Sequence, residues 1–324
     1  MHMKTKTAIK LVFGVLVMLV LFLSIGLDKV ASSIWSINIP LFLLAVLVIV
    51  PLAFTGSMKW WLILRSSGVP ASIGFACRTF LIGGFFSFIT PSKVGSLSKF
   101  YYVKKHYGTP SSTSFSLAFM DKVFDMFVVL AIASSGAYAL SILSSIWLQA
   151  ALVIVLFMLI FLVLAFSSRR FFVAIATPVL SKLRFLGRAL KIGDPNPAKI
   201  ANQLYDPFSC LRNKPHYFIG IASASVLYWV IYGLQLTILV FALGASLGPM
   251  TGILMACIGT AVGLVPVTID GIGTREATLV YLLSLSGISL EAGIAAAAVL
   301  FALTHVASLA GGVAYLADPK VKAS

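Results

Sequence analysis

Charged side chains inside otherwise apolar stretches are the groups in this sequence best suited to chemistry. Asp121 and Asp125 are four positions apart, so on a helix they lie on one face, where like charges repel. Each ionised group near the centre of an isolated span costs about 2.5–3.5 kcal/mol. The two carboxylates therefore need cationic partners, and Lys93, Lys99 and Arg275 are the candidates. Together these groups could bind a phosphate.

The candidate cations lie at or near breaks in two apolar stretches. The first stretch, residues 73–103, is interrupted at residues 90–95, and the second, residues 250–285, is interrupted at residues 266–276. Non-helical backbone at membrane depth is tolerated only where protein or a water-filled cavity satisfies its polar groups. We therefore predict two re-entrant pairs of half-helices; the alternative is two ordinary spans kinked by proline.

Each break also has a helix-start signal. Thr90 before Pro91 predicts an N-cap followed by the first helical residue. Thr274 before Arg275 and Glu276 predicts a second start, because an acidic first turn complements the helix dipole. Such helix ends bind phosphate. Glycines at the breaks fit a close backbone approach or a positive φ, with helix packing as the alternative. The predicted substrate-binding residues are Lys93, Gly95, Lys99, Asp121, Asp125, Gly271, Gly273, Arg275 and Glu276.

The composition requires a membrane. Of 324 residues, 60% are hydrophobic and 10% are charged, which excludes most cytosolic enzymes, secreted modules and free nucleic-acid binders. The net charge of the chain is +15, and an excess of basic residues in an apolar chain usually lies in cytoplasmic loops beside anionic lipid. With about 20 apolar residues per span, we predict an all-α polytopic membrane protein with six spanning helices plus the two re-entrant hairpins. The predicted spans are residues 9–27, 39–54, 115–140, 147–166, 218–243 and 292–316.

Basic residues orient these spans. If both broken segments return to the side they entered, Lys59, Lys104, Lys105 and the basic residues of 167–215 all lie in the cytoplasm, with both termini. We expect one membrane domain over residues 1–324, with halves 1–140 and 141–324 in an inverted-repeat-like arrangement. The basic, partly apolar connection 167–215 is typical of a helix lying on an anionic leaflet.

No recognisable catalytic motif is present: the sequence has no Walker loop, no dinucleotide-binding glycine motif, no His-Glu-x-x-His and no Gly-x-Ser-x-Gly. We therefore expect neither enzymatic activity nor a cofactor. Gln235 is expected to form a helix–helix hydrogen bond. His305 is expected to be a packed neutral histidine, with a proton path as the alternative.

Three motifs in order resemble a known family: Pro91-Ser-Lys-Val-Gly95 with Lys99, Asp121-Lys122-Val-Phe-Asp125, and Gly271-Ile-Gly273-Thr-Arg275-Glu276. They resemble the flippase-like family that includes the transmembrane region of lysylphosphatidylglycerol synthases. The resemblance implies a multi-pass plasma-membrane protein that moves a phosphate-bearing lipid between leaflets. The partner would be an anionic phospholipid, an aminoacyl-phospholipid or a polyprenyl phosphate. Because the chain stops at Ser324, we expect no aminoacyl-transferase domain.

The motifs depart from the family pattern in three places. The family usually has an acidic residue and then arginine where this chain has Ser96 and Lys99, and Glu-Arg where it has Asp121-Lys122. Asp270 replaces a glycine that is common before Gly271. The first two departures concern the headgroup chemistry, and the third adds a negative charge beside the predicted anion site.

Three other functions stay open alongside the lipid flippase hypothesis. An intramembrane prenyl-phosphate transferase would hold Mg²⁺ on Asp121 and Asp125. A coupled carrier of small solutes would use His305 and Glu276 as a proton path. A regulatory partner of a lipid-modifying enzyme would transport nothing. The sequence also leaves homo-oligomerisation open, and it predicts no nucleic-acid partner.

Overall fold

The computed structural model describes most of the apolar part of the chain. It covers residues 35–89, 91–139, 153, 157, 160, 167–182, 196–264 and 273–317, with backbone alone at residues 88, 89 and 91–94. Across these residues all regular structure is helical, as predicted, and no strand occurs. The predicted spans 9–27 and 147–166 lie outside the described residues, apart from three single positions in the second.

Helices occupy nearly all of the described sequence. Before residue 140 they are α3 (Ile39–Leu47), α4 (Ile49–Ser66), α5 (Ile73–Ile89), the 3₁₀ helix η1 (Pro91–Ser98), α6 (Lys99–Tyr107) and α7 (Ser111–Ala139). After it they are α9 (Arg169–Lys182), α11 (Pro197–Arg212), α12 (Pro215–Ala242), α13 (Pro249–Gly263), α14 (Thr274–Leu285) and α15 (Leu290–Leu316). Three helical segments are long and apolar enough to cross a membrane: α3 with α4, α12, and α15.

The predicted span 39–54 is too short, because the helix continues to Ser66. Lys59, which we expected in a cytoplasmic loop, lies inside α4 with a side chain only 2% exposed. The polar residues around it, such as Thr55 and Ser57, are also buried against neighbouring helices. The fall in hydropathy after Phe54 therefore marks a polar interior and not the end of the helix.

Both broken segments reverse direction and fold back on themselves. The ring of Phe75, near the start of α5, lies 5.0 Å from the ring of Tyr107, the last residue of α6. Midway along, a Cβ on Gly83 would lie 3.2 Å from the Ser96 carbonyl oxygen of η1. In the second segment Gly259 of α13 packs against Leu279 of α14. Each segment is therefore a helical hairpin.

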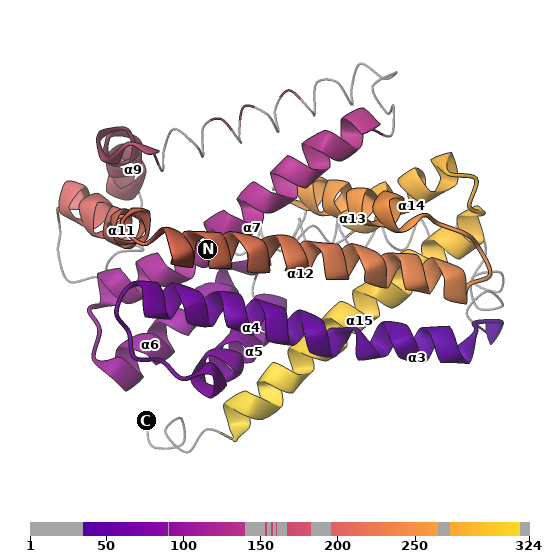
Figure 1. The fold of residues 1–324 in the computed structure, drawn as a ribbon, viewed down its shortest axis with the longest axis horizontal. Helices are drawn as coiled ribbons and strands as arrows, with labels where there is room; N and C mark the ends of the chain where they lie inside the picture. Colours follow the sequence, from indigo (N-terminus) through magenta and orange to yellow (C-terminus); the bar gives the residue numbers. More distant parts are fainter. Residues whose placement is uncertain are drawn as a thin grey trace, which may run out of the picture.

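The hairpins pack on helices of the opposite part of the chain. Gly311 of α15 touches α5 so closely that a Cβ there would lie 1.9 Å from the Leu81 carbonyl oxygen. In the same way Gly136 of α7 lies against Leu254 and Ile258 of α13. This exchange joins the two parts into one bundle (Figure 1).

The long helices of the two parts run in opposite directions. Asn38, just before α3, donates its backbone N–H to the Ala242 carbonyl at the end of α12, 2.8 Å away. At the other end of the bundle, Lys214 before α12 donates to the Ser66 carbonyl at the end of α4, at 2.7 Å. The two hydrogen bonds fix α3–α4 antiparallel to α12, as Figure 1 shows.

Apolar packing forms two cores with polar residues between them. One core includes Leu52, Val129 and Leu236, and the other includes Trp60, Val123 and Ile221. Helices α4, α7 and α12 each pass through both cores. Asp125 of α7 lies between the residues that this helix contributes to the two cores, and Tyr228 of α12 packs against the first core.

The basic connection is only partly described. Helix α11 buries Leu204, Tyr205 and Phe208, and its Leu204 carbonyl accepts a hydrogen bond from the Ser116 hydroxyl of α7. Arg169 of α9 pairs with Asp206 of α11 at 2.7 Å. This part of the connection is therefore docked onto the bundle.

Candidate ligand-binding site

Four charged side chains, three of them buried, form one ion-pair network, here called the tetrad: Lys59, Lys99, Asp121 and Asp125. Lys59 Nζ lies 2.9 Å from Asp121 Oδ1 and 2.5 Å from Asp125 Oδ1, and Lys99 Nζ lies 2.5 Å from Asp121 Oδ2. The side chains of Lys59, Lys99 and Asp121 are each 2% exposed, and that of Asp125 is 20% exposed. The expected pairing of Lys99 is confirmed for Asp121 alone. Asp125 pairs with Lys59, which the predicted site lacked, and Arg275 pairs with Glu276 instead of with the aspartates.

Aromatic side chains hold the tetrad in place. Lys99 Nζ lies 4.5 Å from the ring centroid of Trp60, and the Trp60 indole N–H donates to the Thr79 hydroxyl at 2.9 Å. A cation over an aromatic face is stabilised by the ring quadrupole. Two positive and two negative groups make the tetrad neutral in sum, so it satisfies buried charge without attracting a further anion strongly.

The second charged group lies at the start of α14. Glu276 accepts a hydrogen bond from the Gly273 N–H at 2.8 Å, and its other oxygen lies 2.6 Å from Arg275 Nη2. Gly273 has φ +85°, a conformation that favours glycine, so its predicted positive φ is confirmed. The prediction that Thr274 caps this helix is wrong: Gly273 is the N-cap, Thr274 is the first helical residue, and the Glu276 carboxylate satisfies the free N–H.

A cavity of about 220 Å³, here called the charged chamber, brings the two groups together. Its wall includes four predicted site residues, Lys99, Asp121, Asp125 and Arg275. Glu276 is not part of the wall, but it forms an ion pair with Arg275, which is. The remaining wall comes from both hairpins and from α4, α7, α12 and α15: Lys59, Phe80, Gly83, Gly84, Ser87, Ser96, Lys122, Met126, Val129, Tyr228, Trp229, Thr260, Leu264, Thr304, His305 and Ser308.

The other predicted site residues are placed only in part. Gly95 lies in η1, a right-handed conformation, directly before the lining residue Ser96, and Gly273 begins α14. The side chain of Lys93 and the whole of Gly271, with Asp270 and Thr90, lie outside the described residues.

Lys122 is the second residue that the predicted site lacked. It lines the charged chamber, and within the described part of the chain no ion pair or hydrogen bond holds its ammonium group. On a helix, Lys122 lies about 100° around the axis from Asp121. From the sequence alone, a position in the site and a position at the membrane surface were equally consistent with this angle. The structure puts both residues on the same chamber.

Uncharged donors complete this wall. The indole N–H of Trp229 is buried and has no hydrogen-bond partner among the described residues. The Nδ1 atom of His305 lies 2.6 Å from the Phe301 carbonyl oxygen, as expected for a packed histidine. A ligand in the charged chamber would thus meet both cations and neutral donors.

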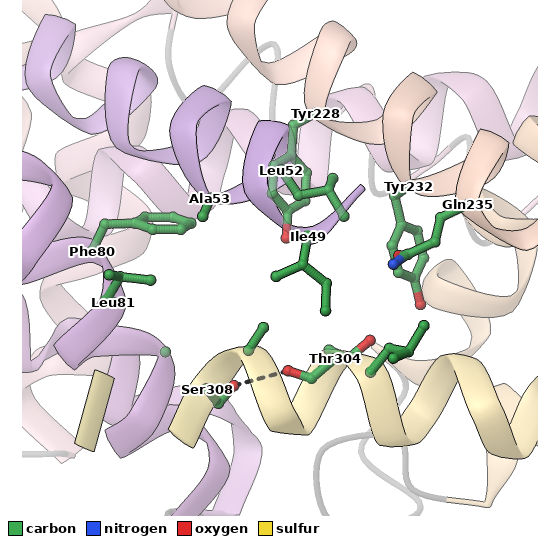
Figure 2. Close-up of a pocket in the computed structure, with 13 residues that line it drawn as sticks. Ile49, Leu52, Ala53, Phe80, Leu81, Tyr228, Tyr232, Gln235, Thr304 and Ser308 are labelled. Atoms are coloured by element: carbon green, nitrogen blue, oxygen red, sulfur yellow. Dashed lines mark hydrogen bonds between the residues drawn. The ribbon is translucent and has the colours of Figure 1, made fainter. Parts of the chain in front are cut away.

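A second cavity of about 130 Å³, here called the apolar chamber, adjoins the first. Figure 2 shows side chains of α4, α5, α12 and α15 facing this space. Among the described residues, no charged side chain lines it. Gln235 forms the expected helix–helix hydrogen bond here, to the Ala45 carbonyl at 2.8 Å. The lining residues are Ile49, Leu52, Ala53, Phe80, Leu81, Gly84, Tyr228, Tyr232, Gln235, Leu303, Thr304, Ala307 and Ser308.

Long apolar helices around a buried charged interior define an integral membrane protein. The chain matches the family model of the lysylphosphatidylglycerol synthase transmembrane region over residues 7–312, and it belongs to this family. The suspected resemblance is thereby confirmed, and the family relates the chain to membrane lipid handling. No curated protein and no solved structure matches the chain with significance.

Proposed function

We propose that the chain binds the phosphate of a membrane lipid in the charged chamber and lets that headgroup pass between the two leaflets. The strongest support is that Arg275 of the second hairpin and Lys122 of α7 line one buried space, although they are far apart in sequence. Cations converging from different elements are the arrangement that a phosphate group requires.

The charge balance favours an anion. Among the described residues, four cations line the chamber, Lys59, Lys99, Lys122 and Arg275, and they are offset by Asp121, Asp125 and Glu276. The tetrad is neutral, and Arg275 is balanced by Glu276, so Lys122 supplies the excess positive charge. Excess positive charge in a membrane interior is costly even though Lys122 interacts electrostatically with Asp121, and an anionic ligand would relieve that cost.

The membrane arrangement of this proposal has six spans, two re-entrant hairpins and both termini in the cytoplasm. Helices α5 and α13 are shorter than the long spans and fold back through η1–α6 and α14. The antiparallel α4 and α12 support hairpins that enter from opposite sides and meet at the chamber. Rocking of one half against the other would then expose the chamber to each leaflet in turn.

The chemistry of the chamber favours binding over catalysis. A Mg²⁺-dependent prenyl-phosphate transferase would need the carboxylates of Asp121 and Asp125 for metal binding. Both carboxylates contact Lys59, and Asp121 also contacts Lys99. The lipid in this proposal is an anionic phospholipid, an aminoacyl-phospholipid or a polyprenyl phosphate of the plasma membrane.

Translocation in reconstituted vesicles tests the proposal. The purified chain would be inserted into phosphatidylcholine vesicles that contain a trace of phosphatidylglycerol with a fluorescent acyl chain, and dithionite added outside would reduce the outer-leaflet label. We expect labelled lipid to move between leaflets faster than in protein-free vesicles, and Arg275→Ala to abolish the gain.

The matched control is Arg169→Ala, because Arg169 is half exposed on α9 and pairs with Asp206 away from the chamber. This variant should keep the native rate. Exchange no faster than in empty vesicles, or equal rates for the native chain and Arg275→Ala, would refute the proposal.

A further inference from the structure

The charged and apolar chambers share part of their walls. Phe80, Gly84 and Tyr228 line both cavities, as do Thr304 and Ser308 on α15. A ligand that fills the charged chamber can therefore extend past these residues into the apolar one. Figure 2 shows Tyr228 and Thr304 at the edge of the apolar space.

The apolar chamber differs from its neighbour in chemistry. Most of its wall is hydrocarbon, including Ile49, Leu52 and Leu303, and all of its lining residues are uncharged. A free phosphate ion or a small polar solute gains nothing from such a space. A hydrocarbon chain is stabilised there, because its methylene groups leave water or, inside a membrane, pack more closely than in the bilayer.

The hydroxyl of Tyr232 is one polar group in this wall that is poorly satisfied. It is buried, and among the described residues it has no well-formed hydrogen bond, its polar contact being with the Thr304 hydroxyl. Figure 2 shows Tyr232 beside Gln235 on the wall of the chamber. A buried hydroxyl without a well-formed hydrogen bond is costly, so an oxygen close to the root of a lipid chain would satisfy it.

The chamber is also close to the lipid-facing surface. Helices α4 and α15 line it with Ala53 and Ala307, and their other faces expose Phe54 and Val306, each more than half accessible. A lipid chain that leaves the apolar chamber therefore has to pass only one helix layer to reach the bilayer.

We propose that the apolar chamber binds the first segment of the hydrocarbon chain of the same lipid whose phosphate occupies the charged chamber. This inference rests on the proposed function and extends it, because the site then selects a phosphate with an attached chain. The root of the chain enters the protein, while the rest of the chain stays in the bilayer.

Binding measurements with two probes test this inference. The first probe is phosphatidylglycerol added to the purified chain in detergent micelles, and the second is glycerol phosphate, which carries a phosphate on glycerol without a hydrocarbon chain. Ala307→Leu places a larger side chain in the apolar chamber without changing the charged one. Ala310→Leu is the matched control, since Ala310 is exposed on the same helix and lines neither chamber.

We expect Ala307→Leu to weaken phosphatidylglycerol binding about tenfold, the effect of excluding one or two methylene groups, and to leave glycerol phosphate binding unchanged. Ala310→Leu should change neither. Ala53→Leu, which narrows the same chamber from α4, should repeat the result independently of any local effect on α15.

Failure of the chain-binding inference can be distinguished from failure of the proposed function. Unchanged phosphatidylglycerol binding in both chamber variants, or equal weakening for both probes, would overturn the chain-binding inference while leaving the headgroup site intact. If the native chain bound neither probe, the proposed function would fail and this inference with it.

Discussion

Lys59 Nζ lies 2.5 Å from Asp125 Oδ1, although the two residues are 66 positions apart in the sequence. This contact ties α4 to α7 between the two apolar cores, and Asp121 shares the same lysine. The pairing explains how a lysine and two aspartates can be buried in an apolar bundle. It also gives Lys59 a structural role, which differs from the ligand-binding role proposed for Lys122.

Removal of Lys59 should destabilise the fold. Lys59→Met leaves Asp125 with no lysine contact in the tetrad and Asp121 with Lys99 alone. Breaking a buried pair typically costs about 3 kcal/mol of unfolding free energy, so we expect a clear fall in the thermal unfolding midpoint. Arg65→Met, an exposed change on the same helix, is the control. A midpoint equal to that of the control would contradict the tetrad.

Neutralising both partners should restore part of that loss. In Lys59→Met combined with Asp125→Asn, no unpaired charge remains at Asp125, so the double variant should unfold at a higher temperature than Lys59→Met alone. The check is a double-mutant cycle of unfolding midpoints in one detergent. Additive losses would show that the two side chains do not interact.

Lys122 should affect binding without affecting stability. Since no carboxylate among the described residues pairs with it, Lys122→Met should keep the native unfolding midpoint and weaken phosphatidylglycerol binding about tenfold. Lys105→Met, on the exposed side of α6, is the control for the loss of one positive charge. Equal binding by both variants would remove Lys122 from the site.

Glu276→Gln tests whether the Glu276 carboxylate is the counter-charge of Arg275 that a lipid phosphate can replace. The variant leaves Arg275 without its counter-charge, so the ligand-free chain should unfold at a lower temperature. A lipid phosphate can replace that charge, and phosphatidylglycerol should therefore raise the unfolding midpoint more in the variant than in the native chain. Glu291→Gln, in the first turn of α15, is the control. A smaller lipid-induced rise in Glu276→Gln would contradict this account of Arg275.

The crossing of α5 and α15 should tolerate no added Cβ. Gly311→Ala would place a methyl group 1.9 Å from the Leu81 carbonyl oxygen, so the helices must separate, at a cost of about 3 kcal/mol. Gly74→Ala is the matched control, because a Cβ there meets nothing within 4 Å. The measurement is the unfolding midpoint of each variant. Equal midpoints would show that the two helices do not cross at Gly311.

Much of this fold follows from hydropathy alone. The runs that become α7, α12 and α15 were located within a few residues because each is continuously apolar around its charged or polar positions. The two breaks were found because proline, glycine and charge coincide there. Hydropathy failed at α4, where buried polar residues such as Lys59 look like the end of a span.

Site residues could be predicted only where their spacing in the sequence is informative. The four-residue interval between Asp121 and Asp125 predicted cationic partners for both carboxylates, and Lys99 is the partner of Asp121. Lys59 gave no such signal, because its partners lie on another helix and only the packing of α4 on α7 brings them together. The apolar chamber could not be predicted for the same reason. Four helices form its wall, and most of the residues that line it are apolar residues with no distinctive pattern in the sequence.

The most direct test of the central claim is native mass spectrometry of the chain extracted gently from its membrane. The account predicts that the native chain retains a phosphate-bearing lipid, that Lys122→Met and Arg275→Ala together lose it, and that Arg169→Ala retains it. A native chain without bound lipid, or equal retention by the chamber variant and the surface control, would contradict the claim that this chamber binds a lipid phosphate.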